Sequence, residues 1–376
     1  MKFAITREAL LQPLQQVIGV VERRQTLPIL ANVMLEVNSG LLAVTATDLE
    51  VELIGKIALE QPHEEGVTTV PARKLLDICR SLPDGASIEI ETAEGRLHLR
   101  AGRSRYRLAT LAAEEFPNVD EGQAPALAAF AVAQSILKRL IEKTSFAMAQ
   151  QDVRFYLCGM LLEISGGAGQ LRGVATDGHR LAMYTVENIE SVATGLLSNR
   201  VQAIIPRKGT LEIARLLKES EEPVRVQLTQ HHLRIENSDV VIISKLVDGK
   251  FPDYEKVIPR GGDKVLLGER LALRDAFNRA AILSNEKYRG VRMQLDRDTL
   301  RLIASNPEQE QAEEELSVHY QGPQMEIGFN VGYLTDALAA LDQNEARFTF
   351  SSAESSVLID VPNDASGCYV VMPMKL

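Results

Sequence analysis

The sequence predicts an α+β protein built from three similar domains, each with two helices packed on antiparallel sheets. The first observation is a signature that occurs three times, after an apolar alternating run each time: Ala46-Thr47-Asp48, Ala175-Thr176-Asp177 and Ala304-Ser305-Asn306. An offset of 129 residues separates each copy from the next. This period is far longer than that of a solenoid repeat and matches the size of a small domain.

The second observation is a strand end that runs into a helix. Val70-Pro71-Ala72-Arg73-Lys74 is repeated as Ile205-Pro206-Arg207-Lys208, and a third copy at Phe329–Leu334 lacks the proline and the basic pair. A third observation is an Xaa-Pro pair that closes each unit, at Pro117, Pro252 and Pro373. Together with turn signals near Pro125 and Pro259, these landmarks predict domains at 1–125, 126–259 and 260–376.

Apolar spacing predicts two helices in each domain. The first helices are expected at 7–20, 134–149 and 269–284, and the second at 72–82, 209–219 and 332–342. Short alternating strands are expected between them, for example at 31–37, 41–46, 51–60, 224–229 and 240–247. Ser165–Gly169 is glycine-rich and predicts a hairpin tip.

Composition is that of an ordinary globular protein, with 45% hydrophobic and 24% charged residues. No apolar run is long enough to cross a bilayer, and the first eight residues lack the pattern of a signal peptide. Three widely spaced cysteines argue against a disulfide framework or a cysteine-rich metal site. We therefore expect a cytoplasmic protein.

The net charge of −10 argues at first against a nucleic-acid partner. The predicted helices are nevertheless mostly basic, and acidic residues gather elsewhere, as in Glu308–Glu315. Solvated helix faces would explain any one of these helices. Five basic helices out of six favour a surface that faces phosphates and does not read bases.

Several longer motifs show a resemblance to a known family. They are Thr26–Leu30, Val70–Lys74, Ala175–Ala182, Ser244–Gly249, Phe251–Tyr254, Leu283–Lys287 and the closing Tyr369–Leu376. Over essentially its full length the chain resembles the bacterial replicative sliding clamp, the β subunit of DNA polymerase III. The resemblance implies the DNA clamp fold and a head-to-tail homodimeric ring that encircles duplex DNA and tethers polymerases.

The resemblance also implies DNA contacts that are independent of sequence. The positions it supplies are Arg24, Gln151, Arg154 and Tyr156, and the charge pattern adds Arg73, Arg207 and Lys208. Arg24 could instead be a solvated loop arginine, and Tyr156 could belong to the core. A ring needs only weak phosphate contacts, because encirclement holds it on DNA.

Ring closure in this family joins the first domain of one subunit to the third domain of its partner. The matching residues form a basic side and a mostly acidic side, which would attract each other. They are Lys74, Arg103, Arg105, Tyr106 and Leu108, facing Ile282, Leu283, Glu308, Glu310, Glu313 and Glu314. A solvated loop would also explain the glutamate run.

The resemblance implies a partner-peptide groove between the second and third domains. Its positions are Leu157, Thr176, Gly178, His179, Arg180, Leu181, Pro252, Val257, Tyr333, Ser356, Val370, Met372, Pro373, Met374 and Leu376. Methionines suit a site that accepts several partners. The implied partners are the polymerase III α subunit, clamp-loader subunits, and other polymerases and repair proteins. Glu354 and Glu255 depart from the family pattern, where an apolar and a basic residue are expected.

The two alternative functions are an enzyme and a non-ring scaffold. An enzyme is not favoured, because the set Asp177, His179 and Arg180 is neither a catalytic triad nor a set of metal ligands. The segment Ser135–Lys138 matches the SxxK pattern, but its companion motifs are absent. The sequence also contains no nucleotide-binding loop. We therefore expect no catalysis, no metal and no cofactor. A non-ring oligomeric scaffold that binds protein partners through a groove remains the alternative, which native mass would distinguish.

Overall fold

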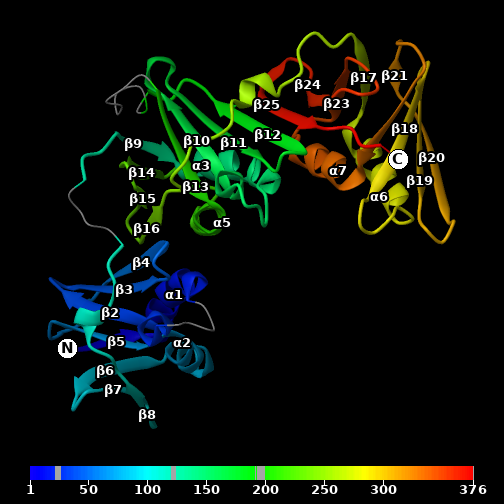
Figure 1. The fold of residues 1–376 in the computed structure, drawn as a ribbon. Helices are drawn as coiled ribbons and strands as arrows, with labels where there is room; N and C mark the ends of the chain where they lie inside the picture. Colours follow the sequence, from blue (N-terminus) through cyan, green and yellow to red (C-terminus); the bar gives the residue numbers. More distant parts are fainter. Residues whose placement is uncertain (22–26, 120–123, 191, 193–199, 376) are drawn as a thin grey trace. The chain divides into compact units, whose positions relative to one another are not determined.

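The computed structural model describes residues 1–21, 27–119, 124–190, 192 and 200–375 (Figure 1). Their backbone clusters into two compact units. The described residues of the first lie in Met1–Ser135 and Lys208–Leu246, and those of the second lie in Ile136–Ala193, Asn199–Arg207 and Val247–Leu376. Both units combine helices with antiparallel sheets, so the predicted fold class is confirmed.

Each of the six α-helices in the described residues begins directly after a strand. The pairs are β1 (Lys2–Thr6) and α1 (Arg7–Val17), β5 (Gly66–Pro71) and α2 (Ala72–Ser81), β9 (Ala128–Ala133) and α3 (Gln134–Glu142), β13 (Arg200–Pro206) and α5 (Arg207–Leu216), β17 (Lys264–Glu269) and α6 (Arg270–Ala281), and β22 (Met325–Asn330) and α7 (Val331–Ala340). Side-chain caps fix three of these starts, since Thr6, Glu269 and Asn330 accept backbone N–H groups of the first helical turn.

The helix expected over 134–149 is shorter than predicted. It ends at Glu142, and a 3-10 turn at Ser145–Ala147 follows. Thr144 has φ of −130°, outside the helical region, and its hydroxyl donates to the carbonyl of Leu140 at 2.8 Å. This local hydrogen bond competes with continuation of the helix.

The first unit contains two sheets. The eight-stranded sheet has the order β5-β2-β3-β4-β16-β15-β14-β9, and the four-stranded sheet has the order β1-β6-β7-β8. The strands not yet given are β2 (Asn32–Asn38), β3 (Leu41–Thr47), β4 (Val51–Ala58), β6 (Ser87–Ala93), β7 (Arg96–Ala101), β8 (Ser104–Ala109), β14 (Pro223–Leu228), β15 (His232–Glu236) and β16 (Val240–Lys245).

The second unit repeats this plan. Its nine-stranded sheet has the order β13-β10-β11-β12-β25-β24-β23-β17-β21, and its four-stranded sheet has the order β20-β19-β18-β22. The remaining strands are β10 (Gly159–Ser165), β11 (Gln170–Thr176), β12 (Arg180–Val186), β18 (Gly290–Asp296), β19 (Thr299–Ser305), β20 (Gln311–Ser317), β21 (His319–Tyr320), β23 (Glu345–Phe350), β24 (Val357–Val361) and β25 (Asp364–Val371). The predicted hairpin tip is present between β10 and β11.

Each long sheet consists of two half-sheets that meet edge to edge. In the first unit β4 pairs with β16, and in the second unit β12 pairs with β25, antiparallel in both cases. The two four-stranded sheets look like unjoined halves of the same kind, ending at β8 and at β20. The described part of the chain therefore holds two completed junctions and two half-sheets with a free edge.

The repeated signature forms the same turn in its first two copies. Asp48 Oδ1 accepts the N–H groups of Glu50 and Val51 at 2.9 and 2.7 Å, and Asp177 Oδ1 accepts those two and three residues later at 2.9 and 3.0 Å. The residue after each aspartate has positive φ, +79° at Leu49 and +88° at Gly178. The shared Asx turn confirms that the sequence repeat is a structural repeat.

Candidate functional site

The structure brings many of the predicted groove residues together in the second unit, where β12 meets β25. Leu181 pairs with Val370 and Arg180 pairs with Val371. Beyond the strand, the N–H of Met372 donates to the carbonyl of His179 at 2.9 Å. The turn after β11 and the end of the chain therefore lie side by side. We call Thr176–Leu181 together with Val370–Met374 the turn-and-tail site.

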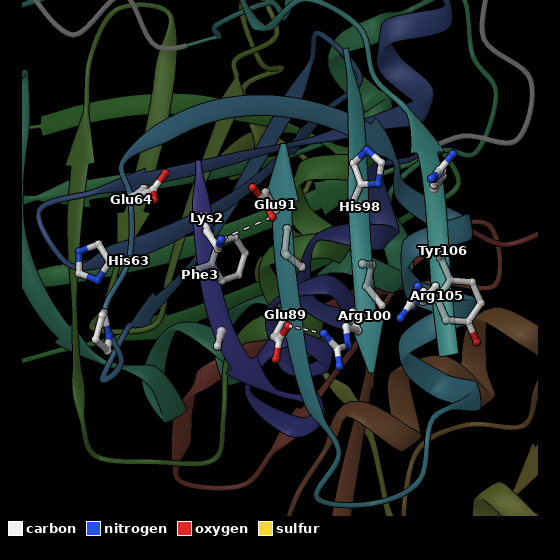
Figure 2. Close-up of a pocket in the computed structure, with 15 residues that line it drawn as sticks. Lys2, Phe3, His63, Glu64, Glu89, Glu91, His98, Arg100, Arg105 and Tyr106 are labelled. Atoms are coloured by element: carbon white, nitrogen blue, oxygen red, sulfur yellow. Dashed lines mark ion pairs between the residues drawn. The ribbon is translucent and has the colours of Figure 1, made fainter. Parts of the chain in front are cut away.

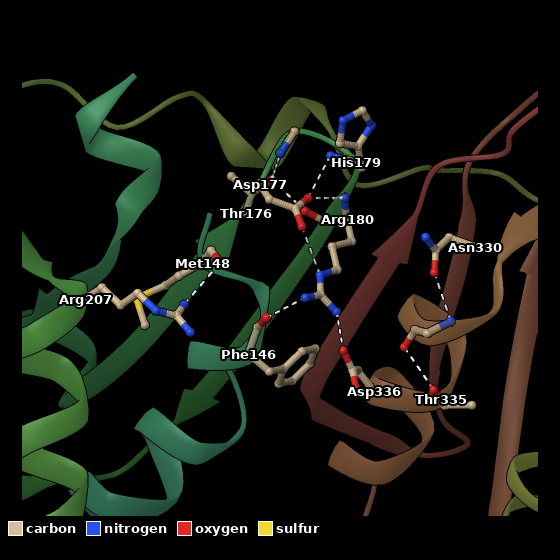
Figure 3. Close-up of polar contacts among 12 residues, drawn as sticks. Phe146, Met148, Thr176, Asp177, His179, Arg180, Arg207, Asn330, Thr335 and Asp336 are labelled. Atoms are coloured by element: carbon tan, nitrogen blue, oxygen red, sulfur yellow. Dashed lines mark hydrogen bonds and ion pairs between the residues drawn. The ribbon is translucent and has the colours of Figure 1, made fainter. Parts of the chain in front are cut away.

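Arg180 is the polar centre of this site (Figure 3). Its guanidinium donates to Asp177 Oδ2 at 3.1 Å, to Asp336 Oδ2 at 2.5 Å and to the carbonyl of Phe146 at 2.6 Å. It also lies over the ring of Tyr333, 4.5 Å from the ring centroid. Because one cation holds the turn, the 145–147 segment and α7, the shape of the site depends on Arg180.

The turn itself is fixed by backbone hydrogen bonds. The Thr176 hydroxyl donates to the carbonyl of Arg180 at 2.6 Å and accepts the N–H of Gly178 at 3.1 Å. His179 and Gly178 are exposed at its tip. The positive φ of Gly178 suits glycine, which has no Cβ to strain the turn.

An apolar cluster lies beneath the site. It contains Leu181 and Val370 together with Phe251 and Tyr254, which belong to the segment 247–259 between β16 and β17. We call this segment the connector. Its Pro252 and Val257, both predicted groove residues, are exposed beside the buried Phe251 and Tyr254. The connector therefore presents apolar side chains to solvent while it is anchored from below.

The tail continues past the last strand. Met374 donates its N–H to the carbonyl of Gly328 at 2.8 Å, and Met372 is exposed. Tyr333 is half-buried on α7, Ser356 precedes β24, and Leu157 is buried in a 3-10 turn at Phe155–Cys158. Leu376 lies outside the described residues.

Both residues that depart from the family pattern are exposed. Glu354 lies in the turn between β23 and β24, where its N–H donates to the Ser352 hydroxyl at 3.3 Å. Glu255 lies on the connector and forms an ion pair with Arg200 at 3.6 Å. The acidic residue on the connector therefore has a partner within the chain.

The segment before β10 carries three predicted DNA contacts. Gln151 is exposed, Arg154 is exposed, and Tyr156 is half-buried against the apolar cluster beneath the site. Arg154 donates from Nε and a terminal nitrogen to Asp152 at 3.0 and 2.8 Å, which lowers the pKa of that carboxyl to about 2. The Arg154 guanidinium also lies next to Gly178, so it borders the turn-and-tail site.

Two exposed side chains in this segment were not predicted from the sequence. Phe155 is 73% exposed and Val153 is 90% exposed, on either side of Arg154. An apolar residue next to arginine and glutamine is a weak signal in a sequence, because most such residues are buried. The exposed ring of Phe155 is available to contact a partner, whereas Tyr156 is half-buried.

The predicted DNA contacts on the helices make contacts within the protein. Arg73 donates to the carbonyl of Val21 at 2.8 Å, Arg207 donates to the carbonyl of Met148 at 3.4 Å, and Lys208 forms an ion pair with Asp48. Carbonyl acceptors carry no net charge, so Arg73 and Arg207 keep their positive charge, whereas Asp48 compensates that of Lys208. Arg24 lies outside the described residues.

Two other basic helix residues are engaged by a carboxylate. Arg139 and Lys143 on and after α3 both form ion pairs with Asp342, which follows α7. Burial of Asp342 acts to raise its pKa, but hydrogen bonds from Lys143 and Arg139 outweigh it and lower the pKa below the usual value. The sequence-level count of basic helices therefore overstated the charge available to DNA.

The predicted basic side of the subunit interface lies on β8 and its surroundings. Arg103, Arg105 and Arg107 are exposed, Tyr106 is half-buried and Leu108 is buried. The outer face of this sheet is hollowed, with Glu89 and Glu91 on β6 beside Arg100 and His98 on β7 (Figure 2). Arg100 stands opposite Arg105 across the two strands, and it also forms an ion pair with Glu89 at 3.9 Å, so a carboxylate of the same sheet lies next to these like charges. Lys74 is exposed on α2.

The predicted acidic side lies on β20 and after α6. Glu313 is exposed and pairs with Arg301 at 3.1 Å, while Glu314 pairs with Arg279, which lowers the pKa of Glu314. Ile282 is 76% exposed, an unusual position for isoleucine, and Leu283 is half-buried. Glu308 and Glu310 are exposed in the preceding turn.

Among the described residues, no group of three or more His, Cys, Asp or Glu side chains is placed to hold a metal ion. None of the helices in the described ranges has the length and apolar character needed to cross a membrane.

Three repeated domains that share sheets edge to edge define a clamp-type protein, and the comparisons give its family. Models of the DNA polymerase III beta subunit match along the chain: the N-terminal domain at residues 1–120, the central domain at 131–253 and the C-terminal domain at 255–375. The chain therefore belongs to the DNA polymerase III beta subunit family of sliding clamps, which are non-catalytic processivity factors.

Individual relatives agree over their full lengths. The chain is 56% identical to a beta sliding clamp of Pseudomonas aeruginosa and 50% identical to that of Escherichia coli K12, with 100% of each chain covered. It matches a solved sliding clamp of P. aeruginosa with a TM-score of 0.95 at 55% identity, and Caulobacter crescentus pol III beta with 0.93 at 38%, both with full coverage. The predicted family and the sliding-clamp role are confirmed.

Proposed function

We propose that two copies of this chain close head to tail into a ring around duplex DNA, through strand pairing between β8 of one copy and β20 of the other. The main observation behind this proposal is that β8 and β20 are unpaired edge strands of the two four-stranded sheets. Two junctions of the same kind, β4 with β16 and β12 with β25, are already formed within the chain. Pairing at both ends of two copies would complete six equivalent junctions and leave neither β8 nor β20 unpaired.

The internal junctions predict the register of the missing one. The alanines of the three signature copies, Ala46, Ala175 and Ala304, stand opposite Leu53, Ala182 and Ala312, respectively, on the next strand. Leu53 and Ala182 in turn pair with Ile242 and Tyr369 across the two formed junctions. Ala312 occupies the same place on the free edge of β20.

The equivalent residue on β8 follows from the other half-sheets. Cross-strand pairs run from Phe130 through Val226 and Ile235 to Ile242, and from Leu266 through Phe348 and Ile359 to Tyr369. The matching series runs from Phe3 through Ile90 and Leu99 to Tyr106. Tyr106 should therefore pair with Ala312 of the partner copy.

This register places opposite charges across the junction. In an antiparallel pair, each step back along β8 from Tyr106 matches a step forward along β20 from Ala312. Arg105 would therefore face Glu313, and Arg103 would face Glu315. Arg105 also faces Arg100 within its own sheet, where Glu89 pairs with Arg100 at 3.9 Å, and a partner carboxylate would add a counter-charge for Arg105. Charge complementarity and the exposed Ile282 both support this interface over solvation of the two edges.

Cross-linking tests the junction and its register together. Arg105→Cys combined with Glu313→Cys should give, on oxidation, a covalent dimer of twice 41.4 kDa, and either single variant should not. Efficient cross-linking of Arg105→Cys with Gln311→Cys instead would mean a shifted register. Cys79 and Cys368 are buried and should not compete, and the partly exposed Cys158 is replaced by serine in every variant.

Charged substitutions test the same interface without disulfides. Ile282→Asp with Leu283→Asp should give monomers in native mass spectrometry, because two charges would be buried in the junction. An unchanged dimer of this variant would refute the assigned interface. A monomer or an open-ended series of oligomers of the wild-type protein would reject the ring and favour the non-ring scaffold.

We further propose the residue assignments within the clamp. Phosphate contacts are assigned to Gln151, Arg154, Tyr156, Arg73, Arg207, Lys208 and Arg24. The exposed Phe155 would lie against the sugar-phosphate backbone beside them. The turn-and-tail site with Pro252, Val257, Tyr333, Leu157 and Ser356 would bind partner peptides. A P. aeruginosa clamp was solved bound to griselimycin, which makes this compound the natural probe for that site.

The remaining assignments concern organisation and partners. Domains at 1–125, 126–259 and 260–376 are supported by the strand-then-helix repeat, although the compact units divide the chain differently because neighbouring half-sheets pair. The polymerase III α subunit, clamp-loader subunits and repair proteins would bind in turn at the peptide site. The protein would act in the cytoplasm.

A further inference from the structure

A polar cluster lies under the connector on the side of the β10-β11-β13 sheet. Its centre is Glu163 on β10, whose side chain is 2% exposed. Arg200 and Gln202 on β13 donate to Glu163 Oε2, Gln202 at 2.7 Å, and Arg172 on β11 lies 3.5 Å from Oε1. A buried carboxylate is stable only when it is paired and hydrogen-bonded in this way.

Tyr254 joins this cluster to the connector. Its hydroxyl accepts from Arg172 at 2.9 Å and donates to Glu163 Oε2 at 3.2 Å, while its ring packs in the apolar cluster with Leu181 and Val370. The side chain is therefore polar at one end and apolar at the other, and its burial raises the pKa of the phenol. One residue thus couples the polar cluster to two strands of the turn-and-tail site.

Glu255 adds a second attachment one residue later. It pairs at 3.6 Å with Arg200, which also pairs with Glu163. The positive charges of Arg172 and Arg200 then balance the negative charges of Glu163 and Glu255. The acidic residue that departs from the family pattern is accounted for by this pairing.

The connector is also held by Phe251, whose side chain is buried in the apolar cluster, and by the N–H of Val247, which donates to the carbonyl of Ile204 at 2.9 Å. Its short 3-10 turn at Tyr254–Lys256 is closed by the N–H of Val257, which donates to the carbonyl of Tyr254 at 3.0 Å, and Lys256 forms an ion pair with Asp253 at 2.8 Å. Val257 follows directly, and this residue is 45% exposed. Pro252 follows the buried Phe251, whereas Val257 follows the turn that begins at Tyr254. The position of Val257 therefore depends most on how firmly Tyr254 and Glu255 are held.

We propose that Tyr254 and Glu255 are positioning residues that set partner affinity by anchoring the connector to the Glu163 cluster. This inference rests on the proposed peptide site, to which Pro252 and Val257 belong. Neither residue need touch the ligand. Loosening the anchor would allow the connector to move, and the ligand would then have to order it on binding.

The test uses griselimycin binding to the full-length protein by calorimetry. Tyr254→Phe removes the hydroxyl and keeps the ring, and should weaken binding about threefold to tenfold while amide hydrogen exchange at 254–258 becomes faster. Tyr320→Phe is the matched control. It removes a buried hydroxyl that donates to the carbonyl of Pro323 at 2.8 Å, away from the connector, and should leave binding unchanged.

Charge reversal tests the second attachment. Glu255→Lys should weaken griselimycin binding about twofold to fivefold, and Glu255→Lys with Arg200→Glu should recover part of the loss. Glu326→Lys is the control, because its pair with Arg292 at 3.3 Å has similar exposure. Native mass should show the same dimer for every variant.

The outcomes separate the two proposals. If griselimycin does not bind the wild-type protein, the proposed peptide site fails. If the wild type binds and Tyr254→Phe speeds exchange at 254–258 without weakening binding, the site stands and the anchoring role is wrong. If Tyr254→Phe changes neither quantity, the hydroxyl does not hold the connector and the inference is also overturned.

Discussion

Arg180 at the start of β12 donates to Asp336 on α7 at 2.5 Å, although 156 residues separate them in the chain. The same guanidinium is stacked on Tyr333 and bound to the carbonyl of Phe146. The side chain is 13% exposed, so water competes poorly for these hydrogen bonds. The relationship links the repeated turn to the last helix and makes Arg180 part of the framework of the site as well as a candidate ligand.

Arg180→Ala should therefore weaken both folding and ligand binding. Loss of charge-assisted hydrogen bonds to Asp177 and Asp336 should lower the free energy of unfolding by about 2 kcal/mol. Griselimycin binding should weaken by at least about tenfold, as measured by calorimetry. Arg180→Lys should rescue only partly, because an ammonium group cannot reproduce the planar, multidentate contacts. Full rescue by lysine would show that charge alone matters.

Asp152→Asn should strengthen DNA binding. Asp152 is charged at neutral pH, because hydrogen bonds from Arg154 lower its pKa to about 2, and it occupies the guanidinium. Removing the charge should free Arg154 for a phosphate and raise affinity for a short duplex about twofold to fivefold at low salt. Asp263→Asn breaks an exposed pair with Lys264 at 2.6 Å and serves as the control. Weaker DNA binding by Asp152→Asn would instead mean that the aspartate orients Arg154.

Asp342 should contribute stability that depends on pH. Its pKa in the folded protein lies below the usual value because Lys143 and Arg139 outweigh the effect of burial. A depressed folded pKa means that the contribution is present above the unfolded pKa of about 4 and is lost as pH falls through the folded value. Chemical denaturation of Asp342→Asn should show a deficit at pH 7 that shrinks below pH 4. An equal deficit at every pH would assign the role of Asp342 to packing.

Deleting residues 372–376 should abolish griselimycin binding and leave the dimer intact. The truncation spares Val371, which is buried in β25 and pairs with Arg180 and Val357. It removes Met372 and the contact of Met374 with Gly328. Lys375→Ala is the control, since this residue is exposed. Loss of the dimer along with binding, seen by native mass, would show that the tail is structural.

Local patterns in the sequence were sufficient for much of the fold. The 129-residue period marks equivalent turns, because Asp48 and Asp177 form the same backbone hydrogen bonds. Strand ends at Pro71 and Pro206 lead directly into helices, as the motifs predicted. These features depend on residues a few positions apart, where periodicity and turn chemistry are informative.

Features that depend on distant residues were not predictable. The basic residues Arg139 and Lys143 form ion pairs with Asp342, and Glu255 forms an ion pair with Arg200. No spacing rule in the sequence indicates these pairs. The free edges at β8 and β20 were implied by the family resemblance, but their equivalence to the formed junctions required the sheet register. Phe155 was missed because exposure of an aromatic ring is decided by tertiary packing.

The most direct test of the central claim is retention on nicked circular DNA after loading by a cognate loader, measured before and after one cut makes the circle linear. The protein should stay on the circle and be released on cutting, because a closed ring is held by topology and slides off an open end. The dimer cross-linked between Arg105→Cys and Glu313→Cys on the circle should behave in the same way and should survive denaturant until the cut. Retention on the linear form with unblocked ends would show that direct affinity holds the protein, and would contradict encirclement.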